Sequence, residues 1–133
     1  MDDEIRIAIG QESDIVTARQ KGRELAGGAG FSGSELTVIA TAISEVARNI
    51  VVYAQRGEII LRQVQSAGRR GIQVIASDSG PGIPDIALAM RDGFSTGKSL
   101  GLGLPGAKRL MDEFEIVSEV GSGTVVTMRK WAR

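Results

Sequence analysis

The stretch Asp78-Ser79-Gly80-Pro81-Gly82-Ile83 follows an apolar run over 72–76 that alternates enough to predict a half-buried strand. A carboxylate is therefore delivered at the end of a strand, directly before two glycines. Glycine allows a positive φ and lets another group approach the backbone closely. A fixed acceptor beside bare backbone suits a flat, amine-bearing ligand such as adenine. The hexapeptide alone fits equally well a strand that ends in a Pro-Gly turn with a solvated Asp.

The composition is that of an ordinary soluble domain. With 133 residues, 42% hydrophobic and 24% charged, the chain is expected to form one domain over 1–133. Its net charge of zero argues weakly against a nucleic-acid binder. Cys and His are both absent, which excludes disulfides, zinc sites built on these residues and His-dependent triads. An acidic start and the lack of an 18-residue apolar run predict no signal peptide and no membrane span, so a cytoplasmic protein is expected.

Periodicity predicts the elements on both sides of the opening stretch. Alternating isoleucines over 5–9 predict a strand, and Ser13 is predicted to cap a helix that ends at Gly27-Gly28. Apolar runs over 58–64 and 72–77, joined by a basic loop, predict a β-hairpin. The remaining predicted elements are a short helix from Asp85, a glycine-rich loop over 92–99, a helix over 104–114, and strands over 115–120 and 124–131.

A long second helix carries two polar residues of interest. Ser32 is predicted to open it with Glu35 as a capping box, and an apolar stripe continues to about Ala54. A helix turns by about 100° per residue, so Glu45 and Asn49 lie roughly 40° apart on a flank of that stripe. The helix is expected to present a carboxylate and an amide beside the core. The alternative is an exposed polar pair of the kind that most helices carry.

Two glycine-rich segments match phosphate motifs only in part. Gly97-Lys98-Ser99 resembles the end of a P-loop, but that motif needs a glycine where Asp92 stands. The segment 101–106 reads G-x-G-x-x-G, yet no strand precedes it and too few residues follow for a doubly wound sheet. A glycine-rich loop before a helix N-terminus still offers free N–H groups and a positive dipole end, which suits phosphate. A glycine hinge with a simple helix cap stays open as the alternative.

Four motifs together resemble the GHKL ATPase/kinase family, whose members share the Bergerat nucleotide-binding fold. They are Glu45 and Asn49 for the N box, Asp78, Gly80 and Gly82 for the first glycine box, Gly101 and Gly103 for the second, and Thr124 for the last box. The resemblance covers essentially the whole chain. It implies an α+β fold, a two-layer α/β sandwich with a mixed, mostly antiparallel sheet that helices cover on one face.

The resemblance also implies roles for single residues. Glu45 would be the general base, and Asn49 would bind Mg²⁺ through its amide oxygen. Asp78 would accept from the adenine amino group, Thr124 would support the same edge directly or through water, and residues 92–100 would form a lid over ATP. The nucleotide contacts implied in addition are Gly80, Gly82, Ile83, Thr96, Lys98, Ser99, Gly101, Leu102 and Gly103.

Within the family, the chain is most similar to the stand-alone bacterial serine/threonine kinases. It has neither the His-bearing helix pair of histidine kinases nor room for a transducer domain. The stretches 78–85, 92–96, 101–114 and 130–133 resemble the stressosome switch kinase of this branch. The resemblance implies phosphorylation of STAS-domain stressosome proteins and activation of a PP2C-type phosphatase by partner switching. Two alternatives stay open: an anti-sigma factor kinase that binds a sigma factor directly, and a non-catalytic nucleotide-binding module.

Overall fold

The computed structural model describes residues 4–83, 90 and 103–132. Along the chain the elements are β1 (Ile5–Ile9), α1 (Glu12–Gly28), α2 (Ser34–Asn49), the π-helical turn η1 (Ile50–Ala54), β2 (Gly57–Ser66), β3 (Arg69–Asp78), α4 (Gly103–Leu110), β4 (Glu113–Glu119) and β5 (Gly123–Trp131). The short helix predicted from Asp85 and the loop predicted over 92–99 lie outside the described residues.

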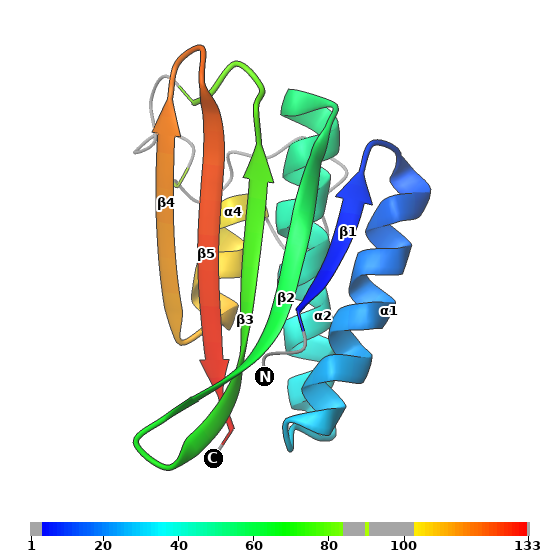
Figure 1. The fold of residues 1–133 in the computed structure, drawn as a ribbon, viewed down its shortest axis with the longest axis vertical. Helices are drawn as coiled ribbons and strands as arrows, with labels where there is room; N and C mark the ends of the chain where they lie inside the picture. The colour runs from blue at the N-terminus through cyan, green and yellow to red at the C-terminus, as the bar shows by residue number, and fades with distance from the viewer. Residues whose placement is uncertain (1–3, 84–89, 91–102, 133) are drawn as a thin grey trace.

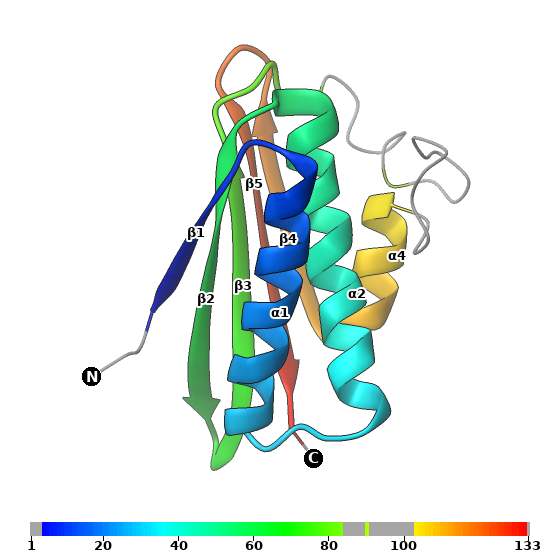
Figure 2. The same ribbon diagram turned by 90° about the vertical axis from the view of Figure 1, so that its right-hand side faces the viewer.

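The strands form one 5-stranded sheet in the order β1-β2-β3-β5-β4 (Figure 1). Each neighbouring pair of described strands is antiparallel. The helices α1, α2 and α4 all lie on one face of this sheet, as Figure 2 shows. The predicted α+β class and the two-layer sandwich are therefore confirmed. The parallel pairing that a mixed sheet would contain is not found among the described strands.

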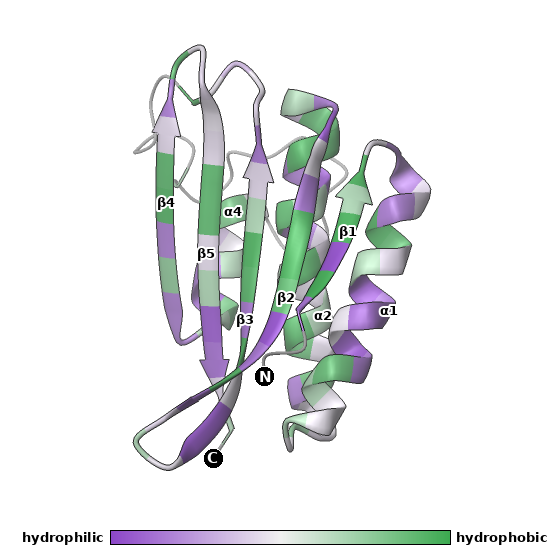
Figure 3. Ribbon diagram, viewed as in Figure 1, coloured by the Kyte–Doolittle hydropathy of each residue, from purple (hydrophilic) through white to green (hydrophobic). Residues whose placement is uncertain are grey.

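The core lies between the sheet and α2. Period-2 alternation points Ile59 and Leu61 of β2 toward the helices, and both are fully buried. Ile39 and Ile43 of α2 meet them from the helical layer, also at 0% exposure. Green and purple segments alternate along β4 in Figure 3, which is the colouring expected for a strand with only one covered face.

The central helical segment is long and apolar enough to cross a membrane. It comprises the 21 residues Ser34–Ala54, and 44% of its most apolar part is buried inside the fold. A core helix of a globular domain can be equally long and apolar, and α2 is such a helix. This single candidate is weak evidence for a membrane span.

Both predicted serine caps are wrong by one or two positions. Helix α1 begins after Gln11 rather than after Ser13, because the carboxylate of Asp14 accepts the N–H groups of Gly10 and Gln11 at 2.9 and 3.1 Å. Helix α2 has Gly33 at its N-cap, without a side-chain cap bond. A charged acceptor in the first turn satisfies the free N–H groups better than a hydroxyl does.

The later boundaries also differ from the prediction. The β2–β3 hairpin turns over Ala67 and Gly68, whose φ values of 53° and 80° suit a two-residue turn, so both strands run into the predicted loop. The helical segment α2–η1, by contrast, ends at Ala54 as the apolar stripe predicts, and Gln55 with φ 69° follows it. Helix α4 ends at Leu110, and β4 begins at residue 113, because pairing with β5 takes over there.

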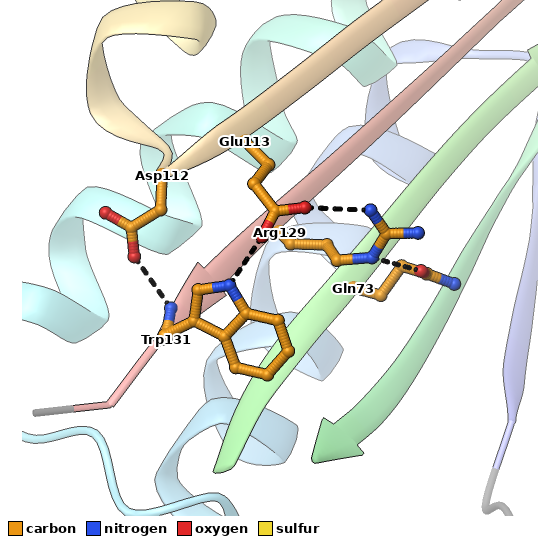
Figure 4. A network of polar contacts seen from close by, with 5 residues as sticks. All are labelled: Gln73, Asp112, Glu113, Arg129 and Trp131. Carbon is orange, nitrogen blue, oxygen red and sulfur yellow. Dashed lines mark hydrogen bonds and ion pairs between the residues drawn. The ribbon is translucent and has the colours of Figure 1, made fainter. Parts of the chain in front are cut away.

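A polar network fastens the end of the sheet where the chain finishes (Figure 4). The indole N–H of Trp131 donates to Glu113 at 2.7 Å, and Arg129 joins Glu113 to Gln73 at 2.9 and 2.7 Å. The backbone N–H of Trp131 donates to Asp112. The hydrogen bonds to Glu113 stabilise its carboxylate and lower the pKa of Glu113 below its usual 4.5. The bond from Trp131 has the largest effect and the bond from Arg129 the next largest. Register places this network at the opposite end of β5 from Thr124.

Candidate functional site

Three segments meet at one end of the sandwich: the end of α2 with η1, the end of β3, and the β4–β5 turn (Figures 1 and 2). Strand pairing causes this meeting, because Asp78 lies opposite Gly57 on one side and Thr124 on the other. Gly57 in turn follows η1 closely in the chain. Residues from three distant parts of the sequence therefore surround the carboxylate that ends β3.

One carboxylate oxygen of Asp78 accepts hydrogen bonds from the two chain segments beside it. Its Oδ1 accepts the N–H of Gly80 at 2.9 Å and the N–H of Thr124 at 3.2 Å. Both hydrogen bonds found for Asp78 within the described residues go to Oδ1. The second oxygen, Oδ2, therefore has lone pairs for a ligand on a half-buried side chain. This is the fixed acceptor that the sequence predicted.

The glycines after Asp78 are required by close packing. A Cβ at Gly80 would stand 2.5 Å from the Cβ of Ala54 in η1. Gly82 has φ 79°, and a Cβ there would collide with the carbonyl of Glu119 in β4. The N–H of Gly121 also donates to Pro81 at 2.9 Å. The loop 79–83 thus packs against both η1 and the β4–β5 turn, which leaves no room for a side chain at Gly80 or Gly82.

Thr124 and Ile83 both form hydrogen bonds with Ser118, a residue that the sequence motifs did not identify. Ser118 of β4 lies opposite Thr124 in the register, and their hydroxyl oxygens are 2.7 Å apart. The Ser118 hydroxyl also accepts the N–H of Ile83 at 2.7 Å. Thr124 is only 4% exposed. The helix and strand patterns carry no signal for Ser118, since its importance follows from strand register rather than from a motif.

Glu45 lies deeper than predicted. It is 4% exposed, and Ala42 on the same flank of α2 is 0% exposed. The flank is covered because α4 packs against α2. One carboxylate oxygen of Glu45 accepts the N–H of Gly103, the first residue of α4, at 3.2 Å. The predicted base therefore faces the predicted phosphate site at a helix N-terminus.

Asn49 lies at the last position of α2, one helical turn beyond Glu45, and is half-buried. The turn η1 begins at the next residue and wraps toward Gly80. Arg48, beside Asn49, forms an ion pair with the exposed Glu12 at 3.2 Å. The amide of Asn49 thus lies between Glu45 and η1 along the same helical segment.

The remaining predicted contacts are not part of the described structure. Thr96, Lys98, Ser99, Gly101 and Leu102 lie outside the described residues. Of the second glycine box only Gly103 is described, with φ 73°. In the described ranges, no group of three or more His, Cys, Asp and Glu side chains is placed to hold a metal ion.

The described site residues form two groups, one suited to the base of a nucleotide and the other to its phosphates. An acceptor carboxylate and the buried hydroxyl of Thr124, hydrogen-bonded to the half-buried Ser118, lie at the end of β3 and β5. A second carboxylate faces a helix N-terminus between α2 and α4. The first group can recognise an amine-bearing ring, and the second can hold an anion and remove a proton.

Comparison with known proteins agrees with this geometry. Residues 10–130 match the family described as "Histidine kinase-like ATPase domain". The chain is 52% identical over 133 residues to the serine/threonine-protein kinase RsbT of Bacillus subtilis, which covers 100% of both chains. It is 35% identical over 103 residues to an anti-sigma F factor of Thermoanaerobacter, covering 73% of this chain and 71% of the relative. An anti-sigma F factor of Geobacillus stearothermophilus is 32% identical over 103 residues, covering 72% and 69%.

Proposed function

Because the chain belongs to the histidine kinase-like ATPase domain family, the GHKL group that its motifs resemble, we propose that it is a protein serine/threonine kinase that uses ATP. The observation that carries this proposal is the 52% identity to a serine/threonine-protein kinase over the full length of both chains. The buried Glu45 beside the N-terminus of α4 supports it, since a binding module would not need a carboxylate there.

The adenine end selects the nucleotide. The free Oδ2 of Asp78 accepts from the adenine amino group, whereas guanine presents a carbonyl at that position. A hydrogen bond to a charged group contributes about 1.5–3 kcal/mol, which corresponds to roughly 10- to 150-fold in affinity. The loop containing Gly80 and Gly82 forms the wall beside the ring, because side chains are excluded from it.

The transfer takes place at the other end. The acceptor hydroxyl of the substrate protein attacks the γ-phosphorus of ATP, the bond from that phosphorus to the bridging oxygen breaks, and ADP leaves. The carboxylate of Glu45 orients the hydroxyl and takes its proton. The N–H of Gly103, which Glu45 now accepts, is also a donor for a phosphate oxygen. A phosphate bound at α4 would therefore compete with Glu45 for this N–H.

Asn49 fits a magnesium site of the kind ATP enzymes use. Mg²⁺ bound with a nucleotide takes few protein ligands and fills the rest of its shell with phosphate oxygens and water. One half-buried amide, with no carboxylate cluster among the described residues, matches that donor set. When bound, the ion would neutralise charge on the phosphates. Asn49 would hold it one turn from the base.

The partners proposed for this kinase are STAS-domain proteins of the stressosome and a PP2C-type phosphatase, with the kinase cytoplasmic. The support is the full-length similarity to RsbT together with the motif stretches over 78–85 and 101–114. Phosphorylation of the STAS proteins would release the kinase, which would then activate the phosphatase. An anti-sigma factor kinase is the second candidate, and 35% identity to an anti-sigma F factor favours it less because it spans only 103 residues.

A transfer assay tests the proposal. The purified chain is incubated with γ-labelled ATP, Mg²⁺ and a panel of STAS-domain proteins, and the label is mapped by mass spectrometry. We expect label on a Ser or Thr of a STAS protein and none with Glu45→Gln. Bound ATP without transfer to any of them would support a binding module instead. Retention of a sigma factor on the immobilised chain would favour the anti-sigma candidate.

A further inference from the structure

Ser118 makes three hydrogen-bond contacts at the adenine end. Its Oγ lies 2.7 Å from the N–H nitrogen of Ile83, 2.7 Å from Oγ1 of Thr124 and 3.2 Å from the carbonyl oxygen of Gly123. These partners belong to the loop after β3 and to the start of β5. One hydroxyl on β4 therefore ties together the two segments that flank Asp78.

The number of hydrogens decides the direction of each bond. A hydroxyl has one hydrogen and two lone pairs. The N–H of Ile83 uses one lone pair of Ser118, and the carbonyl of Gly123 can only accept, so it takes the Ser118 hydrogen. The second lone pair then accepts the hydrogen of Thr124. This is the assignment that satisfies all three contacts at once, and it leaves Thr124 Oγ1 with lone pairs only.

We infer that Ser118 is a positioning residue that sets the base selectivity of the nucleotide site by holding the Thr124 hydroxyl as an acceptor. The inference rests on the proposed ATP site. With the Thr124 hydrogen directed to Ser118, both Thr124 and Asp78 present acceptors at the same strand position. Two acceptors favour the amino group of adenine, directly or through water, and oppose the carbonyl of guanine.

Removal of the Ser118 hydroxyl takes away the acceptor that fixes the direction of the Thr124 hydrogen. The Thr124 hydroxyl is then free to rotate and to donate its hydrogen to a guanine carbonyl. The N–H of Ile83 also loses its acceptor, which loosens the loop 79–83 against β4. We expect Ser118→Ala to raise the Kd for ATP by about 3- to 10-fold, the range for one neutral hydrogen bond, without weakening GTP equally.

The test measures ATP and GTP binding by calorimetry for the unsubstituted chain, Ser118→Ala, Ser118→Thr and Thr127→Val. Ser118→Thr keeps the hydroxyl and suits a strand, so it should restore the ratio of the two Kd values. Thr127 lies on β5, opposite Ile75 of β3, and Thr127→Val removes a hydroxyl from that strand without touching Ser118. This control should bind both nucleotides as the unsubstituted chain does.

A double-variant cycle isolates the contact. In a Thr124→Val background, Ser118→Ala should leave the ATP-to-GTP ratio unchanged, because no Thr124 hydrogen remains to be redirected. An unaltered ratio in Ser118→Ala alone, or an equal loss of both nucleotides with a lower melting temperature, would overturn the inference. Failure of the unsubstituted chain to bind ATP would instead remove the proposed function.

Discussion

A substitution at Glu45 should separate ATP binding from phosphoryl transfer. Its carboxylate is buried and accepts the N–H of Gly103. Glu45→Gln retains an oxygen for that N–H but cannot take a proton, so the fold and ATP binding should remain while transfer falls by about 100-fold or more. Single-turnover transfer and calorimetric ATP binding check this, with Glu24→Gln on the exposed side of α1 as the control. Unchanged turnover would exclude Glu45 as the base.

Asp78 should control affinity rather than rate. In Asp78→Asn the amide oxygen can still accept from Gly80 and Thr124, so the loop is expected to stay in place. The NH₂ group, however, replaces the charged Oδ2 and repels the adenine amino group. We expect ATP affinity to fall by about 10-fold or more, as measured by calorimetry, with the transfer rate at saturating ATP nearly unchanged. An ATP affinity within twofold of the unsubstituted chain would place adenine recognition elsewhere.

The sequence predicted residues whose role follows from a local pattern. Asp78 could be identified because it ends an apolar run before two glycines. Ser118 could not, since its contacts depend on the register of β4 with β5. The caps at Ser13 and Ser32 were predicted wrongly because several residues near a helix start can occupy the N-cap position. At α1, Asp14 bonds the N–H groups of Gly10 and Gln11, and at α2 Gly33 is the N-cap without any side-chain bond.

At the level of elements, η1 shapes the adenine end. Its last residue, Ala54, lies against Gly80, where an added Cβ would come within 2.5 Å. Gly80→Ala should therefore destabilise the fold by about 1–3 kcal/mol through overpacking and should weaken ATP binding. Ala54→Gly in the same chain should recover part of both losses. Urea unfolding and calorimetry check the pair.

Gly27→Ala is the matched control for this swap, because an added Cβ at Gly27 meets nothing within 4 Å. It should not lower ATP affinity. If Ala54→Gly gives no recovery in the Gly80→Ala chain, the packing between η1 and the loop does not set the affinity.

The elements themselves were largely predictable. The long apolar stripe predicted one helix through to Ala54, and a helical segment does continue that far. A change from α to π geometry at Ile50 has no periodic signature, because Ile50–Ala54 spans only 5 residues, of which Ile50 alone is buried. The strands β2 and β3 were predicted, but their ends next to the turn were not, because charged residues such as Arg69 and Arg70 in an exposed hairpin resemble a loop.

For the whole molecule, the network around Glu113 predicts a pH effect. Its pKa is lowered in the folded state by Trp131 and Arg129, so the unfolded chain binds the proton more readily. The stabilisation should be complete above the usual value of 4.5 and lost as the pH falls through the lower folded pKa. Urea unfolding at pH values on both sides of 4.5, followed by fluorescence of Trp131, measures this.

Glu113→Gln should reduce the change in the free energy of unfolding with pH below 4.5, because the glutamine side chain does not ionise. Glu115→Gln, an exposed neighbour on β4, should not. The same slope in both variants would show that Glu113 does not cause the effect. Since Trp131 is the sole tryptophan of the chain, its signal reports this end of the sheet directly.

No local pattern in the sequence predicts the strand order β1-β2-β3-β5-β4. Hairpins such as β2–β3 and β4–β5 follow from short turns between apolar runs. Pairing of β3 with β5 does not, because more than one arrangement of two hairpins would bury the same side chains. Its register, with Asp78 opposite Thr124, became visible only in three dimensions.

That long-range pairing has a kinetic consequence. Asp78 is carried by one hairpin and Thr124 by the other, and each hairpin can form early from neighbours in the chain. Only closure of β3 on β5 brings the two halves of the adenine end together, and such closure over a long loop is slow. A nucleotide therefore has nothing to bind until folding is nearly complete. Its stabilisation should appear as slower unfolding rather than faster folding, so the lifetime of the folded kinase would follow the ATP supply.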